Sequence, residues 1–385
     1  MGSLSDYNGL PLSYSLPVKT GHFDEETTEN FFSNLLPEQE ILTLLARFKK
    51  FSRNSYFDAL SILGRECAGA IIITEENVLP QVNYKYIDKT DDIINFLQHN
   101  MGLLLLSCGG RLSLAGAQDK ISVLIKDNRF YLHEDYSPTS HILKPDSLIF
   151  PNLVYNEAYC MNLAKELNMN TAECNVIKFE NCRPILVIKR YDRNNGLRIH
   201  QEDFCQIMNI SCETKYQNAG YYYGIPSIIE AAHNLGIDIR YDLLKFTLFN
   251  YFIGNMDGHA KNLSLLYHKD KSITLAPFYD LVSTTVYENL DRDMSMVFGK
   301  HYNIDLIDNE DFLLLAKDLS LSLKDVIECL DYFLTSIPIA INNLKYKYDY
   351  EIVNRINYNI KNSLIKGAQF LNSLKNSFYT MSSHT

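Results

Sequence analysis

The stretch from residue 254 to residue 280 constrains the fold of this chain more than any other. Its sequence, GNMDGHAKNLSLLYHKDKSITLAPFYD, begins as a polar loop and continues as an apolar strand pattern, a charged turn and a second strand pattern. A hairpin of this kind returns Asp280, after the second strand, to the loop that contains Asp257 and Asn262. The pattern therefore predicts two carboxylates and one carboxamide at the mouth of a hairpin.

This trio has the order and spacing of the polar residues of a kinase site. In protein kinases a loop aspartate accepts the proton of the substrate hydroxyl, an asparagine five residues later holds a metal, and an aspartate after the following hairpin holds Mg²⁺. Hard oxygen ligands suit Mg²⁺, which keeps several of its waters. We therefore predict a phosphotransferase with Asp257 as the catalytic residue and Asn262 and Asp280 as metal ligands. The alternative is that these side chains only cap turns, as Asp and Asn often do.

Length and composition favour a folded protein with two lobes. A chain of 385 residues exceeds one compact core, and 46% of its residues are hydrophobic. No apolar run reaches the roughly 18 residues that span a bilayer, and no secretory signal opens the chain. We expect a cytoplasmic protein that does not bind membranes.

Cysteine spacing and net charge argue against three further classes of site. The eight cysteines form no Cys-x-x-Cys pair, which disfavours a zinc site or a redox motif and predicts reduced, structural thiols. The formal net charge of −10 makes direct nucleic-acid binding an unexpected property, because such binding depends on neutralised phosphates.

The secondary-structure patterns predict an α+β protein with the bilobal fold of protein kinases. Residues 1–190 are expected to form a β-rich N-terminal lobe, with a helical subdomain in residues 1–80 and the ATP-loop sheet in residues 100–190. Within this lobe the run AGAIIIT, at residues 68–74, is predicted as a buried strand. Residues 191–385 are expected to form an all-helical C-terminal lobe that carries the catalytic and metal-binding loops.

A small-residue loop between two strand patterns is a candidate phosphate loop. The sequence CGGRLSLAGAQDKISVLIKDNRFYLH, at residues 108–133, contains an Ala-Gly-Ala bend followed by a hairpin with alternating faces. Such a loop can lay backbone N–H groups over phosphates. It lacks a full G-x-G-x-x-G pattern, so an ordinary tight turn is the local alternative.

Lys144 ends the next strand pattern, HILK, where kinases place the lysine that pairs the α- and β-phosphates. Asn156 is predicted to cap a helix that starts at Glu157, which makes Glu157 the candidate ion-pair partner of Lys144. The alternative is a surface lysine and a carboxylate favoured by the helix dipole alone. The junction at residues 190–193, RYDR, is where a bilobal kinase has its hinge.

Taken together, these segments resemble the HipA-like family of bacterial serine/threonine kinases, the toxins of toxin–antitoxin modules. The matching pieces, in the family's order, are PLSYSLPV, FFSNLLPE, GRECAGA, LSLAGAQDK, HILK, NEAYCMNLAKELN, VIKRYDR, QEDFCQ, MDGHAKN and PFYDL. They span nearly the whole chain. The combination of LAGAQ-x-K with DGHAKN and FYD makes the resemblance specific.

The resemblance implies a role for each matching residue. Asp257 would be the catalytic base, Asn262 and Asp280 would hold Mg²⁺, and Ser113 stands where the family has a serine that is autophosphorylated to silence the kinase. The residues implied to bind ATP are Ser113, Ala115, Gly116, Ala117, Gln118, Lys144, Lys189, Tyr191, His259 and Tyr279. Packing alone is the alternative role for Tyr279 and His259.

The resemblance also implies an activity and its partners. It predicts an ATP- and Mg²⁺-dependent serine/threonine protein kinase that arrests growth by phosphorylating a cytosolic protein such as an aminoacyl-tRNA synthetase, and that binds a DNA-binding antitoxin. Relatives commonly begin with an extra β-rich segment ahead of PLSYSLP, which here starts at Pro11, so a small separate subunit is a further expected partner. Lys189 stands where relatives often have an acidic residue, which leaves backbone groups as the expected adenine contacts.

Two other functions fit the same residues. A kinase of a small molecule or a lipid headgroup would use the same site, and phosphate on Ser113 after incubation with ATP would favour the protein kinase. A non-catalytic module that binds an antitoxin as a co-repressor would bind nucleotide without turnover. The presence of all three polar residues of the site argues against this second alternative.

Overall fold

The computed structural model describes residues 11–17, 22–37, 42–43, 46, 52, 55–73, 82–86, 120–134, 136–180, 182–217 and 223–382. The chain forms two units. Unit 1 comprises Met1–Val154, Ala172–Lys215 and Ser264–Ala276, and unit 2 comprises Tyr155–Thr171, Tyr216–Leu263 and Pro277–Thr385. Each unit thus collects stretches from both sides of the boundary predicted at residue 190.

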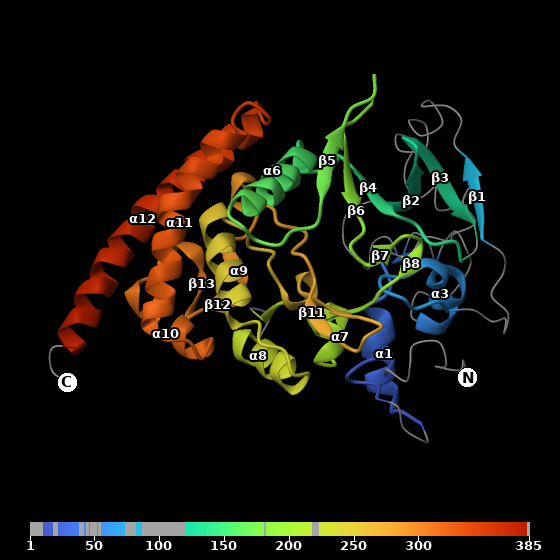
Figure 1. Ribbon diagram of the computed structural model, residues 1–385, viewed down its shortest axis with the longest axis horizontal. Coiled ribbons are helices and arrows are strands. Elements are labelled where there is room, and N and C mark those ends of the chain that lie inside the picture. The colour runs from blue at the N-terminus through green and yellow to red at the C-terminus, as the bar shows by residue number, and fades with distance from the viewer. Residues whose placement is uncertain are drawn as a thin grey trace. The chain divides into compact units, whose positions relative to one another are not determined.

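The main sheet of unit 1 has six strands in the order β1-β3-β2-β4-β6-β5, and each neighbouring pair is antiparallel (Figure 1). The strands are β1 Asn83–Tyr86, β2 Ile121–Lys126, β3 Arg129–Glu134, β4 His141–Pro145, β5 Cys174–Ile177 and β6 Ile185–Lys189. The predicted hairpin in residues 120–133 is confirmed. Its turn places Asp127 and Asn128 at φ 52° and 56°, the left-handed conformation that two-residue hairpin turns require.

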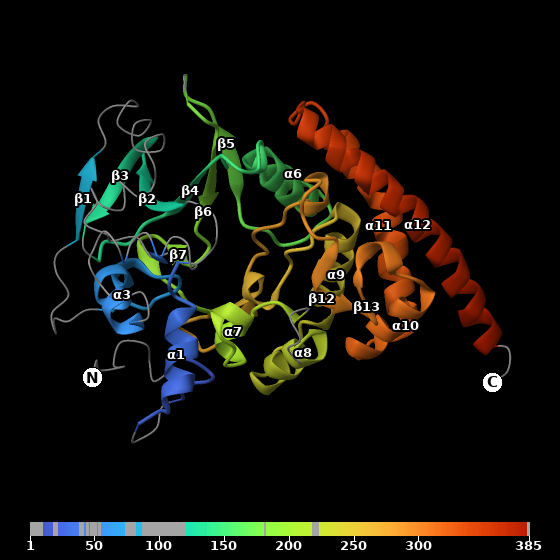
Figure 2. The ribbon, with the colours of Figure 1, turned by 180° about the vertical axis from the view of Figure 1, so that it is seen from behind.

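Two helices of the N-terminal segment share one hydrophobic core with this sheet. Helix α1, Glu25–Ser33, is capped by the Asp24 side chain, and α3, Tyr56–Leu63, is capped by Ser55 and followed by the 3-10 turn η1, Gly64–Glu66. The two helices lie beside each other (Figure 2). Their buried residues, among them Phe31 and Leu63, belong to the same cluster as Ile121, Val123 and Leu143 of the sheet. The helical subdomain is therefore packed onto the sheet rather than separate from it.

The strand predicted at residues 68–74 is wrong over the part that the structure describes. Residues 68–73 pass through a turn, with Gly69 at φ 73°, and pair with no strand of the described chain. The backbone of Gly69 instead donates to the Asp192 carboxylate and accepts from Arg193. Burial of Ile71 explains the apolar sequence without a sheet.

Unit 1 also contains a three-stranded sheet with the order β11-β10-β9. Its strands are β9 His200–Asp203, β10 Ser264–Tyr267 and β11 Ile273–Leu275, so the hairpin predicted after the polar loop is confirmed. A small ribbon, β7 Arg193–Asn194 and β8 Leu197–Arg198, precedes it, and α7 Phe204–Ile207 and η2 Cys212–Thr214 follow β9.

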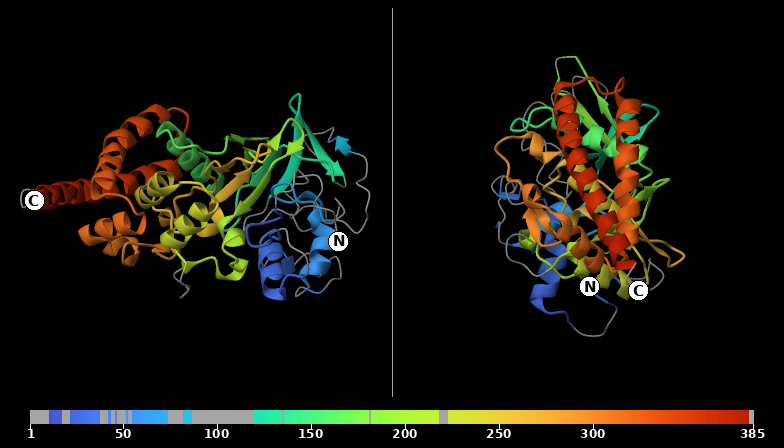
Figure 3. Two further views of the ribbon diagram at one scale, coloured as in Figure 1. Left: turned by 60° about the horizontal axis from the view of Figure 1, so that its bottom comes forward. Right: turned by 90° about the vertical axis from the view of Figure 1, so that its left-hand side faces the viewer.

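Unit 2 is mainly helical. Its helices are α6 Leu153–Glu166, which starts at the end of unit 1, α8 Ile225–Asn234, α9 Arg240–Ile253, α10 Asn309–Asp318, α11 Leu323–Leu344 and α12 Glu351–Ser382, with 3-10 turns η4 Ala260–Asn262, η5 Thr284–Val286 and η6 Ile304–Leu306. The long helices α11 and α12 lie side by side (Figure 3). Helix α9 is buried along most of its length. Its Tyr251 packs against Phe298 and Phe312, which also contact each other, in an aromatic core.

The prediction that residues 191–385 are all helical is wrong. Strands β7 to β11 follow residue 190, and unit 2 has its own hairpin, β12 Asp293–Phe298 and β13 His301–Asn303. Gly299, at φ 63°, makes the tight turn between these two strands, because this conformation is strained for other residues.

Two expectations of the sequence concern the whole chain. None of the helices in the described part of the chain is long and apolar enough to cross a membrane. The seven cysteines of that part carry thiols rather than disulfides, as predicted.

Candidate active site

The loop that carries Asp257 begins where α9 ends. Gly254 closes the helix in the left-handed conformation, at φ 68°. Its carbonyl accepts the backbone N–H groups of Thr284 and Thr285, at 2.9 and 3.1 Å, and the Thr284 hydroxyl accepts the N–H of Met256 at 2.9 Å. A Cβ on Gly254 would lie 2.1 Å from the Thr285 hydroxyl, so only glycine allows this approach. The start of the loop is thus joined to the segment that follows Asp280.

The other end of the loop brings two predicted site residues together. The Asn262 amide donates from Nδ2 to the backbone oxygen of Asp257 at 3.0 Å, and the Asp257 N–H donates to the Asn255 side chain at 3.0 Å. The hydroxyl of Tyr279 donates to the backbone oxygen of Lys261 at 2.7 Å. Tyr279 therefore lies against the same loop one residue before Asp280.

Asp280 lies between two residues that are hydrogen-bonded to this loop region, Tyr279 to Lys261 and Thr284 to Gly254. Its segment therefore runs alongside the loop of Asp257 and Asn262. Its backbone has φ 54°, a left-handed conformation that is uncommon for residues other than glycine. Leu281, which follows, is fully buried. Strain of this kind persists where surrounding contacts hold it, often at functional sites.

The Asp257 carboxylate is approached by two aromatic side chains. The Tyr216 hydroxyl donates to Oδ1 at 2.8 Å, and His259 Nε2 lies 3.7 Å from the same oxygen. The rings of Tyr216 and His259 meet edge to face with centroids 5.2 Å apart. The Asp257 side chain remains 48% exposed, whereas His259 is buried. Tyr216 was not predicted, because it lies 41 residues before Asp257 and in no recognisable motif.

Asn156 has a different role from the predicted one. Helix α6 begins at Leu153, and the Asp146 carboxylate accepts the N–H groups of Asn152 and Val154 at its start, so the prediction that Asn156 caps a helix beginning at Glu157 is wrong. Asn156 is fully buried inside α6. Its amide donates to the Ser283 carbonyl and accepts the Ser283 N–H, both at 2.8 Å.

The remaining predicted residues of the described chain lie in unit 1 or on α6. Lys144, on β4, and Glu157, on α6, are both buried, and their ion pair stays a prediction. Lys189 ends β6 with its side chain 58% exposed and pairs with Glu173 at 3.3 Å; Tyr191 follows it. The predicted ATP-loop residues Ser113, Ala115, Gly116, Ala117 and Gln118 lie outside the described residues.

A buried charge cluster surrounds the predicted hinge. Glu66 accepts from Arg190 and Arg193, each at 2.9 Å, and also contacts Arg198. Asp192 pairs with Arg190 at 2.6 Å and with Arg193 at 2.7 Å. Burial by itself would raise the pKa of the Glu66 carboxyl, but the guanidinium groups of Arg193, Arg190 and Arg198 outweigh it and lower this pKa to about 2. The cluster holds the backbone on both sides of Tyr191 to the turn after η1.

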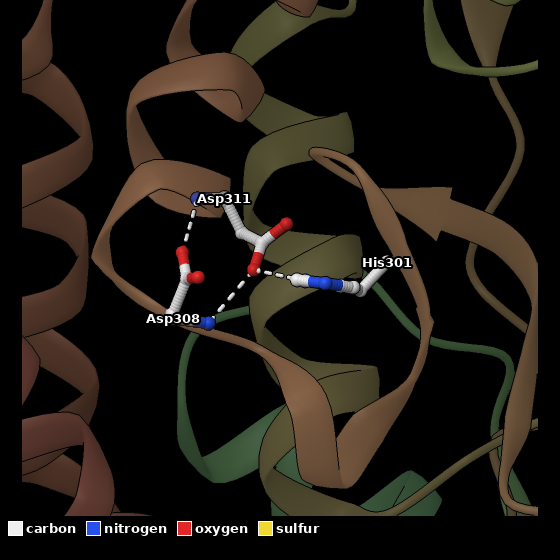
Figure 4. A group of neighbouring side chains, drawn as sticks. All are labelled: His301, Asp308 and Asp311. Carbon is white, nitrogen blue, oxygen red and sulfur yellow. Dashed lines mark hydrogen bonds and ion pairs between the residues drawn. The ribbon is translucent and has the colours of Figure 1, made fainter.

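One group of three side chains in the described chain is close enough to share an ion, but two of its members form a helix cap. His301, Asp308 and Asp311 offer ligand atoms within 4.8 Å of one another (Figure 4). Asp308 and Asp311 form the capping box of α10, His301 Nδ1 lies 2.9 Å from Asp311, and Lys300 Nζ lies 3.1 Å from Asp308. These carboxylates already accept N–H groups and face a cation, so the start of α10 accounts for them.

Two domain models of one protein family match this chain. The HipA N-terminal domain matches residues 3–74, and the HipA-like C-terminal domain matches residues 112–340. The chain belongs to the HipA-like kinase family.

Individual relatives are named as kinases. A putative kinase of Sinorhizobium fredii, Y4mE, is 35% identical over 337 residues, which is 83% of this chain and 79% of that protein. The serine/threonine-protein kinase toxin HipA of Shewanella oneidensis is 29% identical over 317 residues, 77% of this chain and 72% of the toxin. A solved complex of HipA, HipB and operator DNA from Shewanella oneidensis contains a chain with a TM-score of 0.81 and 25% identity, covering 95% of this chain and 91% of that one.

Proposed function

We propose that this chain is an ATP- and Mg²⁺-dependent serine/threonine protein kinase that acts as the toxin of a toxin–antitoxin pair. The observation that supports this most directly is the pairing of two segments. The Asp257–Asn262 loop is hydrogen-bonded to residues 279 to 285 on both sides of Asp280. Two carboxylates and a carboxamide are thereby presented by adjoining backbones, in the order that kinases use.

The side chains of this loop fit a divalent cation. Asn262 uses its Nδ2 to bind the Asp257 carbonyl, which turns the amide oxygen into the atom offered as a ligand. The carboxylate of Asp280 would supply a second hard oxygen, which is the donor type that Mg²⁺ prefers. When bound, Mg²⁺ would neutralise charge on the phosphoryl group that is transferred.

The protein's own groups would provide the rest of the reaction. Asp257, half exposed, would accept a hydrogen bond from the acceptor hydroxyl and orient it toward the γ-phosphate. Lys144, on the sheet of unit 1, would pair the α- and β-phosphates. Tyr279 would contribute by holding the loop backbone at Lys261. Catalysis would rest mainly on positioning and electrostatics.

The relatives support the choice of acceptor and partner. One relative bears the name serine/threonine-protein kinase toxin, and the solved neighbour is a complex with HipB and operator DNA. We therefore propose a protein as substrate and a DNA-binding antitoxin as partner. The family resemblance of the sequence adds two further parts to the proposal: a cytosolic substrate such as an aminoacyl-tRNA synthetase, and autophosphorylation at Ser113 as self-inhibition.

Labelled ATP supplied to the purified protein, with and without a chelator of Mg²⁺, tests the proposal. We expect phosphate on serine or threonine of a protein acceptor, loss of transfer with the chelator, and loss of transfer in Asp257→Asn. Asp331→Asn is the matched control, because it removes an exposed carboxylate on α11 that pairs only loosely with Lys375, at 3.6 Å. Full activity of Asp257→Asn, or transfer confined to lipid or small-molecule acceptors, would overturn the proposal.

A further inference from the structure

Tyr216 makes a direct hydrogen bond to the residue that the proposed function makes catalytic. Its hydroxyl lies 2.8 Å from Asp257 Oδ1, and its ring lies edge to face against His259. Asp257 is half exposed, and an exposed carboxylate explores several rotamers unless a donor fixes it. A phenolic hydroxyl is a directional donor on a stiff side chain with two torsions, so it restricts the carboxylate effectively.

The position of Tyr216 is itself set by the next residue. The Gln217 side-chain oxygen accepts the backbone N–H of Val297, on β12, at 2.9 Å, and its backbone carbonyl accepts the Tyr302 hydroxyl, on β13, at 3.4 Å. Gly224 lies so close that a Cβ there would meet the Gln217 amide at 2.7 Å. Gln217 is therefore tethered to the β12–β13 hairpin.

The same hairpin also supports the other member of the pair. The N–H of Ser295, on β12, donates to the Met256 carbonyl at 2.9 Å, immediately before Asp257. One strand thus binds the residue after Tyr216 and the residue before Asp257. The β12–β13 hairpin is therefore hydrogen-bonded next to both members of the Tyr216–Asp257 pair.

We infer that Tyr216 is a positioning residue that holds Asp257 Oδ1 and so aims the carboxylate at the acceptor hydroxyl, and that the β12–β13 hairpin sets this contact through Gln217. The inference rests on the proposed kinase function. Because a misplacement of about 1 Å can slow a reaction on the order of 100-fold, loss of this contact should act on the chemical step rather than on nucleotide binding.

Tyr216→Phe tests the contact by removing one oxygen atom. We expect kcat for a protein acceptor to fall on the order of 10-fold, the rate equivalent of a hydrogen bond to a charged group, while KM for ATP and the melting temperature stay near wild type. Tyr332→Phe is the matched control, because its hydroxyl donates at 3.1 Å to the Leu167 carbonyl rather than to Asp257, and it should leave kcat unchanged.

A double-mutant cycle with Gln217→Ala tests the tether. Gln217→Ala should lower kcat, and Tyr216→Phe combined with Gln217→Ala should be no slower than Tyr216→Phe alone, because both act through one contact. Fully additive losses would overturn the role of the hairpin.

Three outcomes separate this inference from the proposed function. An unchanged kcat in Tyr216→Phe, with Asp257→Asn inactive, would overturn the inference and leave the kinase assignment intact. A faster Tyr216→Phe would also overturn it, since it would mark the phenol as a competitor of the acceptor. Activity in both Tyr216→Phe and Asp257→Asn would instead refute the catalytic role of Asp257.

Discussion

The buried amide of Asn156 satisfies both backbone groups of Ser283, as donor to its carbonyl and as acceptor of its N–H, each at 2.8 Å. Ser283 lies three residues after Asp280, so this pair fixes the segment that carries a proposed metal ligand to helix α6. The helix that bears Glu157 and the segment that bears Asp280 are therefore joined directly by these two hydrogen bonds.

Replacing Asn156 should weaken both stability and activity. Asn156→Ala leaves a buried N–H and a buried C=O without their side-chain partner, which costs roughly 2–4 kcal/mol of unfolding free energy. Urea unfolding measures this loss, and phosphate transfer should fall with it because Asp280 loses its support. Asn162→Ala, on the same helix, removes a bond to the Ala158 carbonyl of its own turn and an exposed bond from Lys347, and should cost much less. Equal effects of the two variants would contradict the bridging role.

Asp280 allows ligand function and fold stability to be separated. Glycine adopts φ near 54° without strain but adds freedom to the unfolded chain, so Asp280→Gly should unfold within about 1 kcal/mol of wild type. The same variant should lose Mg²⁺-dependent transfer. Thermal melts and a transfer assay on one preparation measure both. A large loss of stability would show that the carboxylate supports the fold instead.

The buried charge cluster predicts a strong effect of Glu66. Glu66→Gln removes the carboxylate that three arginines share, and breaking a buried ion pair in this way costs roughly 3–5 kcal/mol. Because the folded pKa of Glu66 is lowered to about 2, its stabilisation is complete above pH 4.5 and is lost as the pH falls toward 2. Glu173→Gln, which breaks the exposed pair with Lys189, should cost less than about 1 kcal/mol. Similar losses in chemical denaturation would count against the cluster.

Glu202 predicts the opposite dependence on pH. It is fully buried on β9, accepts the Tyr14 N–H at 3.3 Å, and burial raises its pKa from 4.5 to about 7. Its neighbours Tyr267, Ser13 and Asp203 shift this pKa less. The folded state binds the proton more tightly than the unfolded chain, so stability falls as the pH rises from 4.5 to about 7, by an amount on the order of 3 kcal/mol.

The comparison with Glu202→Gln isolates this carboxyl. His200, on the same strand, has a pKa lowered to about 4 by burial, so its contribution to stability rises with pH where that of Glu202 falls. This contribution is present in both the wild type and the variant. The unfolding free energy of the wild type should therefore fall relative to that of Glu202→Gln as the pH rises from 4.5 to about 7. A difference that is flat between pH 5 and pH 8 would refute the protonated state of Glu202.

Patterns in the sequence were sufficient to predict the local structure where the interacting residues are close in the chain. The hairpins at residues 120–133 and 264–275 formed as predicted, because strand alternation and turn residues such as Asp127 and Asn128 act over a few positions. The run at residues 68–74 failed for the opposite reason. Its apolar composition reports the burial of Ile71, whereas a strand needs a partner strand, and the backbone there binds Asp192 and Arg193 instead.

The candidate site shows the same difference between local and long-range contacts. The five-residue spacing of Asp257 and Asn262 was visible in one loop, and the structure joins the two by a hydrogen bond. Asn156 was predicted to cap a helix, but the partners that define its role, the backbone groups of Ser283, lie 127 residues away. A capping asparagine and a bridging asparagine have the same local sequence, so only the tertiary structure distinguishes them.

The chain passes from one unit to the other after residues 154, 171, 215, 263 and 276. A nascent chain that has reached the end of β9 therefore presents this strand before its partner β10 has left the ribosome. Exposed strand edges recruit chaperones or other chains. Translation thus includes an interval in which more than half of the chain is synthesised but the loop of Asp257 is still missing. Because each unit is built from separate segments, a single proteolytic cut cannot release either unit intact.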